Sequence, residues 1–302
     1  PPLSRSRRLR GAQVGRESLA MPGTREGARP FREVSLEALD GTWAVVAPER
    51  GGMATRFVVG GRDVFYLDEA TYLDAGKNVR GGNPVLFPSP GKLTNDRWTH
   101  GKLSQHGFAR TSAWRVASHD AARAELALVL TDDVATRAVY PFGFEARTTY
   151  RVEPGALVIA QRFTCSSGGP MPFGAGFHPY FAVPQADKAQ TRIPTAARRA
   201  FDNRDKQTKA LDRIDLTEDE VDLHLLGHGS TSGTLEAPGM QVVITCSPAF
   251  SHWVVWTLAG RDFVCLEPWT CPGDALNTGE RLLTLDDGAS IELETRIAAS
   301  MR

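Results

Sequence analysis

The chain has 302 residues, with 35 basic and 35 acidic side chains and a formal net charge of zero. Residues 1–32 hold eight arginines and two glutamates, and subtracting them leaves 27 basic against 33 acidic side chains in the rest of the chain. This mildly acidic body argues against a nucleic-acid-binding surface. No apolar run reaches the roughly 18 residues that a membrane span needs.

Residues 1–32 form an Arg-rich extension with several Gly and Pro residues and no hydrophobic period. Such a segment cannot bury enough apolar surface to fold, so we expect it to be disordered. Its composition is also compatible with a transit peptide or an arm that binds polyanions. A true start at Met21 would explain much of it more simply, and it contains no apolar core of a secretory signal.

Period-two alternation of apolar and polar residues recurs after residue 33, whereas helical periodicity is scarce. Residues 290–297 are the clearest example, because every second side chain is apolar or Thr. We predict strands over 42–47, 54–59, 123–131, 144–152, 156–165, 240–246, 252–258, 263–267 and 290–297. So many closely spaced strands predict one all-β domain over residues 33–302, an antiparallel β-sandwich with few short helices.

Two stretches depart from this pattern and are interpreted as long connections, which in compact domains are often functional. Residues 74–112 are rich in Gly, Pro and basic side chains, and residues 185–233, which include Asp222, are charged. The first stretch carries polar groups suited to an oxygen-rich or anionic ligand, namely Arg80, Asn83, Lys92, His100, Lys102, His106 and Arg110.

His178 lies among aromatic residues in the run Gly-Phe-His-Pro-Tyr-Phe, directly after a strand-like stretch. Histidine titrates near neutral pH, so an imidazole at the edge of a dry pocket can exchange protons with a small ligand. A hydrogen-bonded core histidine is the alternative for the residue taken alone. His106 beside Phe108 and Glu267 beside Trp269 repeat the pattern of a polar group next to an aromatic ring, which favours a shared site.

Glu267 follows the apolar run 263–266, where an unpaired carboxylate is costly to bury. It is therefore expected to be hydrogen-bonded, paired with an arginine, or functional. Arg80 precedes another apolar run, and its five donors could hold sugar hydroxyls or a phosphate, or tie the loop backbone together. Phe108 and Trp269 could stack on a sugar ring or belong to the core.

No Gly-rich segment has the spacing of a nucleotide-binding loop. His224 and His228 stand four residues apart, as zinc ligands on a helix do, but no third ligand is implied and Gly227 weakens the helix. We therefore expect neither a metal nor a cofactor. The four cysteines lack metal-type spacing and fit buried, reduced thiols in a cytoplasmic protein.

Five pieces stand in order along the chain: residues 80–88 (RGGNPVLFP), 106–110 (HGFAR), 178–181 (HPYF), Asp222 and residues 267–269 (EPW). Together they resemble the galactose mutarotase-like superfamily, which includes the aldose 1-epimerases and their hexose-6-phosphate relatives. The likeness extends from about residue 40 to 297. It implies a β-supersandwich without metal or cofactor and an open sugar cleft on one face.

The resemblance implies that His178 is the general acid and Glu267 the general base. It further implies that His106 and Arg80 orient ring and hydroxyl oxygens and that Asp222 binds sugar hydroxyls. Interconversion of anomers takes a proton from the C1 hydroxyl and gives one to the ring oxygen, so two such groups suffice. Ordinary pKa values of about 4.3 for Glu and about 6.5 for His leave one group deprotonated while the other carries a proton.

The likeness leaves open whether the substrate is a free aldose or an aldose 6-phosphate. Residues 104–114 are similar to hexose-6-phosphate mutarotases, whereas 267–270 and 277–279 look more like free-sugar aldose epimerases. We expect a free aldose. Asn83 is a further candidate for a substrate contact, and the cations available to a phosphate are Arg80, Lys92, Lys102 and Arg110.

Two functions of other classes remain as alternatives. A non-catalytic carbohydrate-binding module would use the same sandwich without needing both His178 and Glu267. A glycoside hydrolase needs two carboxylates about 5–10 Å apart, for which Asp222 and Glu267 are the available pair, and it leaves His178 without a role. The expected protein is a cytoplasmic monomer or weak homodimer that binds a small-molecule sugar or sugar phosphate.

Overall fold

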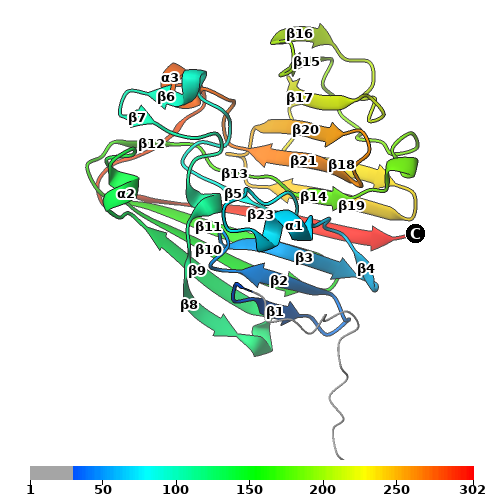
Figure 1. Cartoon of the computed structure of the whole chain (residues 1–302), viewed down its shortest axis with the longest axis horizontal. Coiled ribbons are helices and arrows are strands. Elements are labelled where there is room, and N and C mark those ends of the chain that lie inside the picture. The colour runs from blue at the N-terminus through cyan, green and yellow to red at the C-terminus, as the bar shows by residue number, and fades with distance from the viewer. Residues whose placement is uncertain (1–29) are drawn as a thin grey trace, which may run out of the picture. The chain divides into compact units, whose positions relative to one another are not determined.

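The computed structural model describes residues 30–302, which fold into antiparallel sheets with three short α-helices (Figure 1). The prediction of an all-β antiparallel fold with few helices is confirmed. The predicted extension over residues 1–32 lies almost entirely outside the described residues. Within the described range, no helix is long and apolar enough to cross a membrane.

One sheet has seven antiparallel strands. In spatial order they are β18 (Ser232–Ala237), β19 (Met240–Cys246), β23 (Ser290–Met301), β11 (Ala156–Ser167), β10 (Gly143–Glu153), β9 (Glu125–Thr131) and β8 (Arg115–Asp120). Along most of β10, every second residue is buried and the residues between them are half-buried. This alternation arises because one face of the sheet packs on the core and the other does not.

A second sheet has eight strands. Its order is β16 (Gln207–Ala210), β15 (Arg199–Asp202), β17 (Glu220–Leu226), β20 (His252–Leu258), β21 (Phe263–Trp269), β13 (Gly176–Phe177) and β5 (Val85–Leu86), and β14 (Tyr180–Ala182) also pairs with β21. Strand β21 is buried along its whole length. Its position between β20 on one side and β13 and β14 on the other explains that burial.

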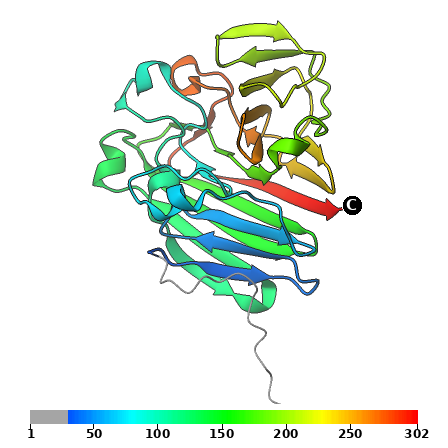
Figure 2. The ribbon, with the colours of Figure 1, turned by 45° about the vertical axis from the view of Figure 1, so that its right-hand side comes forward.

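A four-stranded sheet packs over one face of the seven-stranded sheet (Figures 1 and 2). It contains β1 (Val34–Glu37), β2 (Trp43–Ala47), β3 (Met53–Val59) and β4 (Arg62–Asp63). The hydroxyl of Tyr150 on β10 donates to the carbonyl oxygen of Gly52 over 2.7 Å and joins the two layers. Two further sheets have two strands each. One is the hairpin of β6 (Arg97–Trp98) and β7 (Gly101–Lys102), and the other pairs β12 (Met171–Phe173) with the distant β22 (Leu283–Leu285).

Helical segments are short connections between strands. The α-helices are α1 (Glu69–Leu73), α2 (Val134–Arg137) and α3 (Ala275–Thr278), and single 3₁₀ turns span Thr94–Asp96, Ala109–Thr111, Ala121–Arg123 and Gln185–Asp187. The Asp68 carboxylate accepts from two backbone N–H groups at the start of α1, and Asp133 forms a capping box at the start of α2.

The loop that follows β5 is anchored to the core through Phe87. The Phe87 ring stacks on Phe163 with centroids 5.1 Å apart, and its carbonyl oxygen accepts from the backbone N–H of Phe108. Gly107 has a φ of 68°, and a Cβ there would lie 2.2 Å from that same carbonyl oxygen. Only glycine therefore allows the His106 segment to approach β5 so closely.

The interpretation of residues 185–233 as one irregular connection is wrong, because β15, β16 and β17 lie within this range and β18 begins there. Strand β17 reads Glu-Val-Asp-Leu-His-Leu-Leu, and Val221 and Leu225 lie in the main core. Glu220, Asp222 and His224 point to the other face of the strand and are polar because they face a cleft. This alternation is present in the sequence, but the charged residues around it made the segment resemble a loop.

Candidate active site

A cleft of about 1010 Å³ opens over the second sheet, on the face opposite the main core. Successive residues of a strand point to opposite faces, so every second residue of three neighbouring strands reaches the cleft. These residues are Glu220, Asp222 and His224 of β17, His252, Val254 and Trp256 of β20, and Glu267 and Trp269 of β21. The period of the strands therefore gathers the titratable side chains on one surface.

His178 stands directly across from Glu267. Strands β13 and β14 both pair antiparallel with β21, through Gly176 opposite Trp269 and Tyr180 opposite Cys265, and the two ladders share one register. His178 Nε2 lies 3.4 Å from Glu267 Oε1. The two side chains are nearly inaccessible to solvent and both line the cleft. The structure thus brings the predicted acid and base into contact.

Aromatic side chains orient both members of this pair. The His178 ring stacks on Tyr180 with centroids 4.7 Å apart and an interplanar angle of 10°. Trp269 Nε1 donates to Glu267 Oε2 over 3.2 Å. Among the described residues, His178 Nδ1 has no hydrogen-bond partner, so Nε2 is the nitrogen placed to exchange a proton.

Burial shifts the pKa values of the pair in opposite directions. The pKa of Glu267 is raised well above its usual value, first by desolvation and then by repulsion from Asp222. The pKa of His178 is lowered well below its usual value, first by desolvation and then by electrostatic interaction with His106 and Arg110. The neutral pair is therefore favoured over the ion pair, in contrast to the expectation drawn from ordinary pKa values.

His106 forms part of the cleft wall as a neutral hydrogen-bond acceptor. Its Nδ1 contacts the carbonyl oxygen of Pro90 and must carry the proton there, which leaves Nε2 as an acceptor 3.2 Å from the Gln105 amide nitrogen. Desolvation and the charge of Arg110 lower the pKa of His106 to about 3. A sugar hydroxyl that displaces the Gln105 amide can donate to the same Nε2 lone pair.

Asp222 accepts one hydrogen bond and lies near an imidazole. Asn203 Nδ2 donates to Asp222 Oδ2 over 2.7 Å, and His224 Nε2 lies 3.8 Å from Asp222 Oδ1. His224 Nδ1 in turn lies 2.8 Å from His252 Nε2. Desolvation lowers the pKa of His224 to about 4 and that of His252 well below its usual value, so both rings are neutral near pH 7.

The contact between the two imidazoles links their tautomers. If His252 Nε2 donates to His224 Nδ1, His224 carries its own proton on Nε2, the nitrogen that lies 3.8 Å from Asp222 Oδ1. Sequence reasoning missed Asn203 and His252 and considered His224 only as a zinc ligand. The polar positions at every second residue of 220–226 were the signal for His224.

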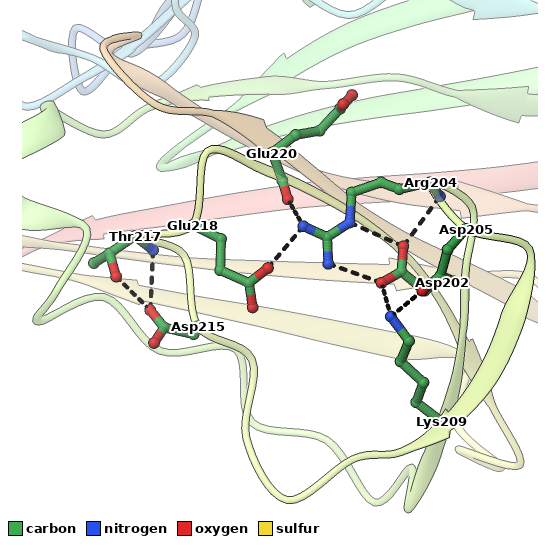
Figure 3. Close-up of polar contacts among 8 residues, drawn as sticks. All are labelled: Asp202, Arg204, Asp205, Lys209, Asp215, Thr217, Glu218 and Glu220. Atoms are coloured by element: carbon green, nitrogen blue, oxygen red, sulfur yellow. Dashed lines mark hydrogen bonds and ion pairs between the residues drawn. The ribbon is translucent and has the colours of Figure 1, made fainter.

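Asn203 follows β15 in the turn that leads to β16, and a set of ion pairs holds this turn (Figure 3). Arg204 pairs with both oxygens of Asp202 at 2.9 and 2.8 Å and reaches Glu218 at 2.7 Å. Lys209 adds a 2.7 Å contact to Asp202. The pKa of Asp202 is consequently lowered, chiefly by Arg204. The network fixes the segment that presents Asn203 to Asp222.

The predicted cations divide into those at the cleft and those elsewhere. Arg80 and Lys92 line the cleft and are exposed, and neither side chain has a hydrogen-bond partner within residues 30–302. Arg110 lies deeper, where burial lowers its pKa. Lys206 and Arg281, which sequence reasoning did not single out, also line the cleft.

Asn83, His100 and Lys102 do not line the cleft. Asn83 is completely buried, and its backbone N–H donates to the carbonyl oxygen of Ala54 over 2.8 Å. The segment enters the core at this point, which leaves Asn83 without access to a cleft ligand. Phe108 packs edge-on against Phe87, outside the cleft lining.

The helical zinc pair does not form. His224 is on a strand that ends at Leu226, and His228 Nε2 lies instead 3.1 Å from the carbonyl oxygen of Ser251. All four cysteines are free and buried, as predicted. A different group of three potential metal ligands is formed by His178, Cys265 and Glu267. His178 and Glu267 line the cleft, whereas Cys265 is completely buried and does not.

Comparison with known proteins relates this geometry to a family. The family model described as Aldose 1-epimerase matches residues 40–298. A protein of Cenchrus ciliaris, provisionally named a glucose-6-phosphate 1-epimerase, is 26% identical over 210 residues, which are 65% of this chain and 61% of that protein. The chain thus matches about three fifths of the length of this curated relative.

Two solved structures are similar over nearly the whole described chain. The Slr1438 protein of Synechocystis sp. PCC 6803 has a TM-score of 0.87 and 31% identity, covering 93% of this chain and 100% of that one. A galactose mutarotase related enzyme from Lactobacillus acidophilus has a TM-score of 0.70 and 22% identity, covering 89% and 97% of the two chains, which shows a shared fold. With the family model matched over most of its length, the chain belongs to the aldose 1-epimerase family.

Proposed function

We propose that this protein interconverts the α and β anomers of an aldohexose. The observation that carries the proposal is the contact of His178 with Glu267, two proton-transfer groups 3.4 Å apart at an open cleft. Removal of the C1 hydroxyl proton and protonation of the ring oxygen open the ring to an aldehyde. Rotation about C1–C2 and closure from the other face give the second anomer, and each transfer can contribute about 10²–10⁴-fold.

In the proposed ring opening, Glu267 takes the proton of the C1 hydroxyl and His178 gives one to the ring oxygen. The pair begins as carboxylate and imidazolium and ends as carboxylic acid and neutral imidazole. Because burial raises the pKa of Glu267 and lowers that of His178, it favours the neutral state that ring opening leaves behind. Ring closure reverses both transfers and restores the charged pair.

The charged pair can also form without exchange with solvent. A single proton moves between Glu267 Oε1 and His178 Nε2, which lie 3.4 Å apart. The neutral resting pair and the charged reacting pair therefore hold the same number of protons, and the energetic difference between them is set by burial and by the groups around them.

The remaining cleft residues are proposed to hold the sugar in place. His106 accepts from a hydroxyl through Nε2, and Asp222 accepts from sugar hydroxyls with the lone pairs that Asn203 and His224 leave free. Arg80 is placed to donate to sugar oxygens from the rim. Holding the ring in one orientation converts two proton transfers into steps within one complex.

The charge of the cleft supports a free aldose as the substrate. Its basic residues are Arg80, Lys92, Arg110, Lys206 and Arg281. With Glu267 neutral in the resting pair, four acidic residues oppose them, Glu220, Asp222, Asp274 and Glu280. An excess of one positive charge offers no strong field for an anionic substrate.

A glucose-6-phosphate 1-epimerase is the second candidate, favoured by one specific observation. Arg80 and Lys92 are exposed at the cleft, and their side chains have no hydrogen-bond partner among residues 30–302. Such cations are available to a phosphate. The name of the Cenchrus ciliaris relative points to the same substrate.

Polarimetry tests the proposal directly. Freshly dissolved α-glucose and α-galactose should reach anomeric equilibrium faster with the protein than without it. Binding of these sugars without any acceleration, for either the free sugars or their 6-phosphates, would establish a carbohydrate-binding module instead. Release of reducing sugar from an aryl glycoside would establish a hydrolase that uses Asp222 and Glu267.

A further inference from the structure

Cys265 lies beside the proposed catalytic pair but has no part in the proton transfers. It precedes Glu267 by two residues on β21, so the two side chains share a face of the sheet. One potential ligand atom from each of His178, Cys265 and Glu267 lies within 4.8 Å of the other two. The three side chains are 7%, 0% and 1% exposed, which places a nitrogen, a sulfur and an oxygen donor together in a nearly dry site.

The spacing of the three donors fits a small tetrahedral coordination sphere. Zinc binds imidazole nitrogen and carboxylate oxygen at about 2.0–2.1 Å, so two such ligands in a tetrahedron stand about 3.4 Å apart. His178 Nε2 and Glu267 Oε1 are 3.4 Å apart. A thiolate binds zinc at about 2.3 Å, and a side-chain movement of roughly 1 Å brings a sulfur from 4.8 Å to a tetrahedral edge.

The geometry points to a binding site for a thiophilic divalent cation, zinc above all, formed by His178, Cys265 and Glu267, and we propose that such an ion inhibits the protein. As the metal bonds form, the thiol proton of Cys265 and the carboxylic acid proton of Glu267 both leave to solvent. The thiolate and the Glu267 carboxylate then neutralise the two positive charges, so that no net charge stays buried. The fourth coordination position faces the cleft from which the ion enters.

The donor set determines which ions bind. Sulfur and imidazole ligands suit zinc and cobalt, whereas magnesium prefers an octahedron of oxygens and keeps its waters. An ion at this site uses the His178 and Glu267 lone pairs that the proton transfers need. The inhibition therefore rests on the proposed function, but the binding does not.

Cobalt(II) is the probe for binding, because a thiolate ligand gives it a charge-transfer absorption band that oxygen and nitrogen ligands lack. Titration of the full-length, metal-free protein with cobalt chloride should produce this band, and zinc chloride should displace it. Cys265→Ser should abolish the band. Cys271→Ser is the matched control, because Cys271 is equally buried but is not among the three donors, and it should keep the band.

Two further variants keep the test decisive if Cys265→Ser does not fold, as judged by circular dichroism. His178→Asn and Glu267→Gln each remove one ligand and should each weaken cobalt binding by more than about tenfold, since even groups outside the coordination sphere are worth about 10–100-fold in affinity. A thiolate band of unchanged affinity in both variants would overturn the site.

Inhibition is measured by the polarimetric assay. Zinc should inhibit the wild type in competition with the sugar, a chelator should restore activity, and magnesium should have no effect. Cys265→Ser should keep the metal-free activity but need more than about tenfold more zinc for the same inhibition. Equal inhibition of the Cys265→Ser and Cys271→Ser variants would overturn the proposal.

The binding and activity readouts separate the two proposals. A thiolate–cobalt band in a wild type that accelerates no mutarotation would support the metal site and refute the proposed function. Active wild type without a thiolate band would refute the metal site and leave the proposed function standing.

Discussion

His252 Nε2 lies 2.8 Å from His224 Nδ1, and this contact determines which nitrogen of His224 faces Asp222. With the His252 proton donated to Nδ1, His224 must carry its own proton on Nε2. The Asp222 carboxylate then accepts from Asn203 over 2.7 Å and faces the N–H of His224 at 3.8 Å, too far for a hydrogen bond. His252 is thus a positioning residue that acts through His224.

Replacing His252 by Phe should therefore weaken sugar binding by about 2–10-fold, since one hydrogen bond is worth about 0.5–1.5 kcal/mol. The loss should appear in KM more than in kcat, because Asp222 is proposed to hold the substrate and not to transfer the proton. His252→Gln retains a donor and should recover part of the loss. His228→Asn is the control. If His252 had a purely structural role, all three variants would show the same KM at equal stability.

Removing either member of the catalytic pair should nearly abolish the reaction. His178→Asn and Glu267→Gln keep similar shapes but cannot transfer protons, so kcat in the polarimetric assay should fall by about 10²–10⁴-fold. His119→Asn and Glu292→Gln make the same chemical changes at exposed positions outside the cleft and should have no effect. Either catalytic variant with more than a tenth of wild-type kcat would contradict the assignment.

The pair is active while it holds one proton, so kcat/KM should show a bell-shaped pH profile. Since the pKa of Glu267 is raised, the alkaline limb should lie well above 4.5, and since the pKa of His178 is lowered, the acidic limb should lie well below 6.5. Activity should therefore be maximal between the lowered pKa of His178 and the raised pKa of Glu267. An acidic limb above 6.5 or an alkaline limb below 4.5 would contradict the shifts.

Asp222 gives this profile a specific test. After desolvation, its charge is the next cause of the raised pKa of Glu267. In Asp222→Asn that repulsion is lost, the pKa of Glu267 falls, and the pair loses its proton at lower pH, so the alkaline limb should move to lower pH. Glu280→Gln removes another cleft carboxylate and should leave the limb in place. An alkaline limb that moves to higher pH would contradict the proposed repulsion between Asp222 and Glu267.

The rim cations decide between the two substrates. Catalytic efficiency on glucose should equal or exceed that on glucose 6-phosphate. Any activity on the phosphate should fall by about 10–100-fold in the Arg80→Ala, Lys92→Ala double variant, since hydrogen bonds between charged groups are worth about 1.5–3 kcal/mol. Lys102→Ala, outside the cleft, is the control. A strong phosphate preference that the double variant abolishes would establish the second candidate.

Tyr150 links two layers of the sandwich, and its loss should be visible in stability. Tyr150→Phe leaves the carbonyl oxygen of Gly52 buried without its donor, which should cost about 1–3 kcal/mol of unfolding free energy. Urea denaturation should show a lower midpoint with an unchanged slope. A changed slope would indicate that the substitution alters the denatured state rather than this contact.

The fold was largely predictable because its strands alternate. Residues 290–297 and 144–152 each have one core face, and both lie within observed strands. Strand β17 was missed because a strand that borders a cleft places Glu220, Asp222 and His224 where an ordinary exposed face would also be polar. The family resemblance was confirmed by the family model over residues 40–298.

The candidate site was predictable in its residue types but not in its contacts. The family resemblance assigned His178 and Glu267 to one site. Their contact depends on the register of β13 and β14 against β21. No local pattern contains that register. Their pKa shifts were equally hidden, because burial is a property of the assembled sheet and ordinary values predicted the opposite charge state.

The common register of β13 and β14 has a consequence for the variation that the chain can tolerate. Three residues separate Gly176 from Tyr180, and they match the three that separate Cys265 from Trp269. One residue inserted or deleted in either segment would turn His178 or Glu267 to the other face of the sheet. Relatives that share this activity should therefore differ in the length of their loops but not in the length of these two short segments.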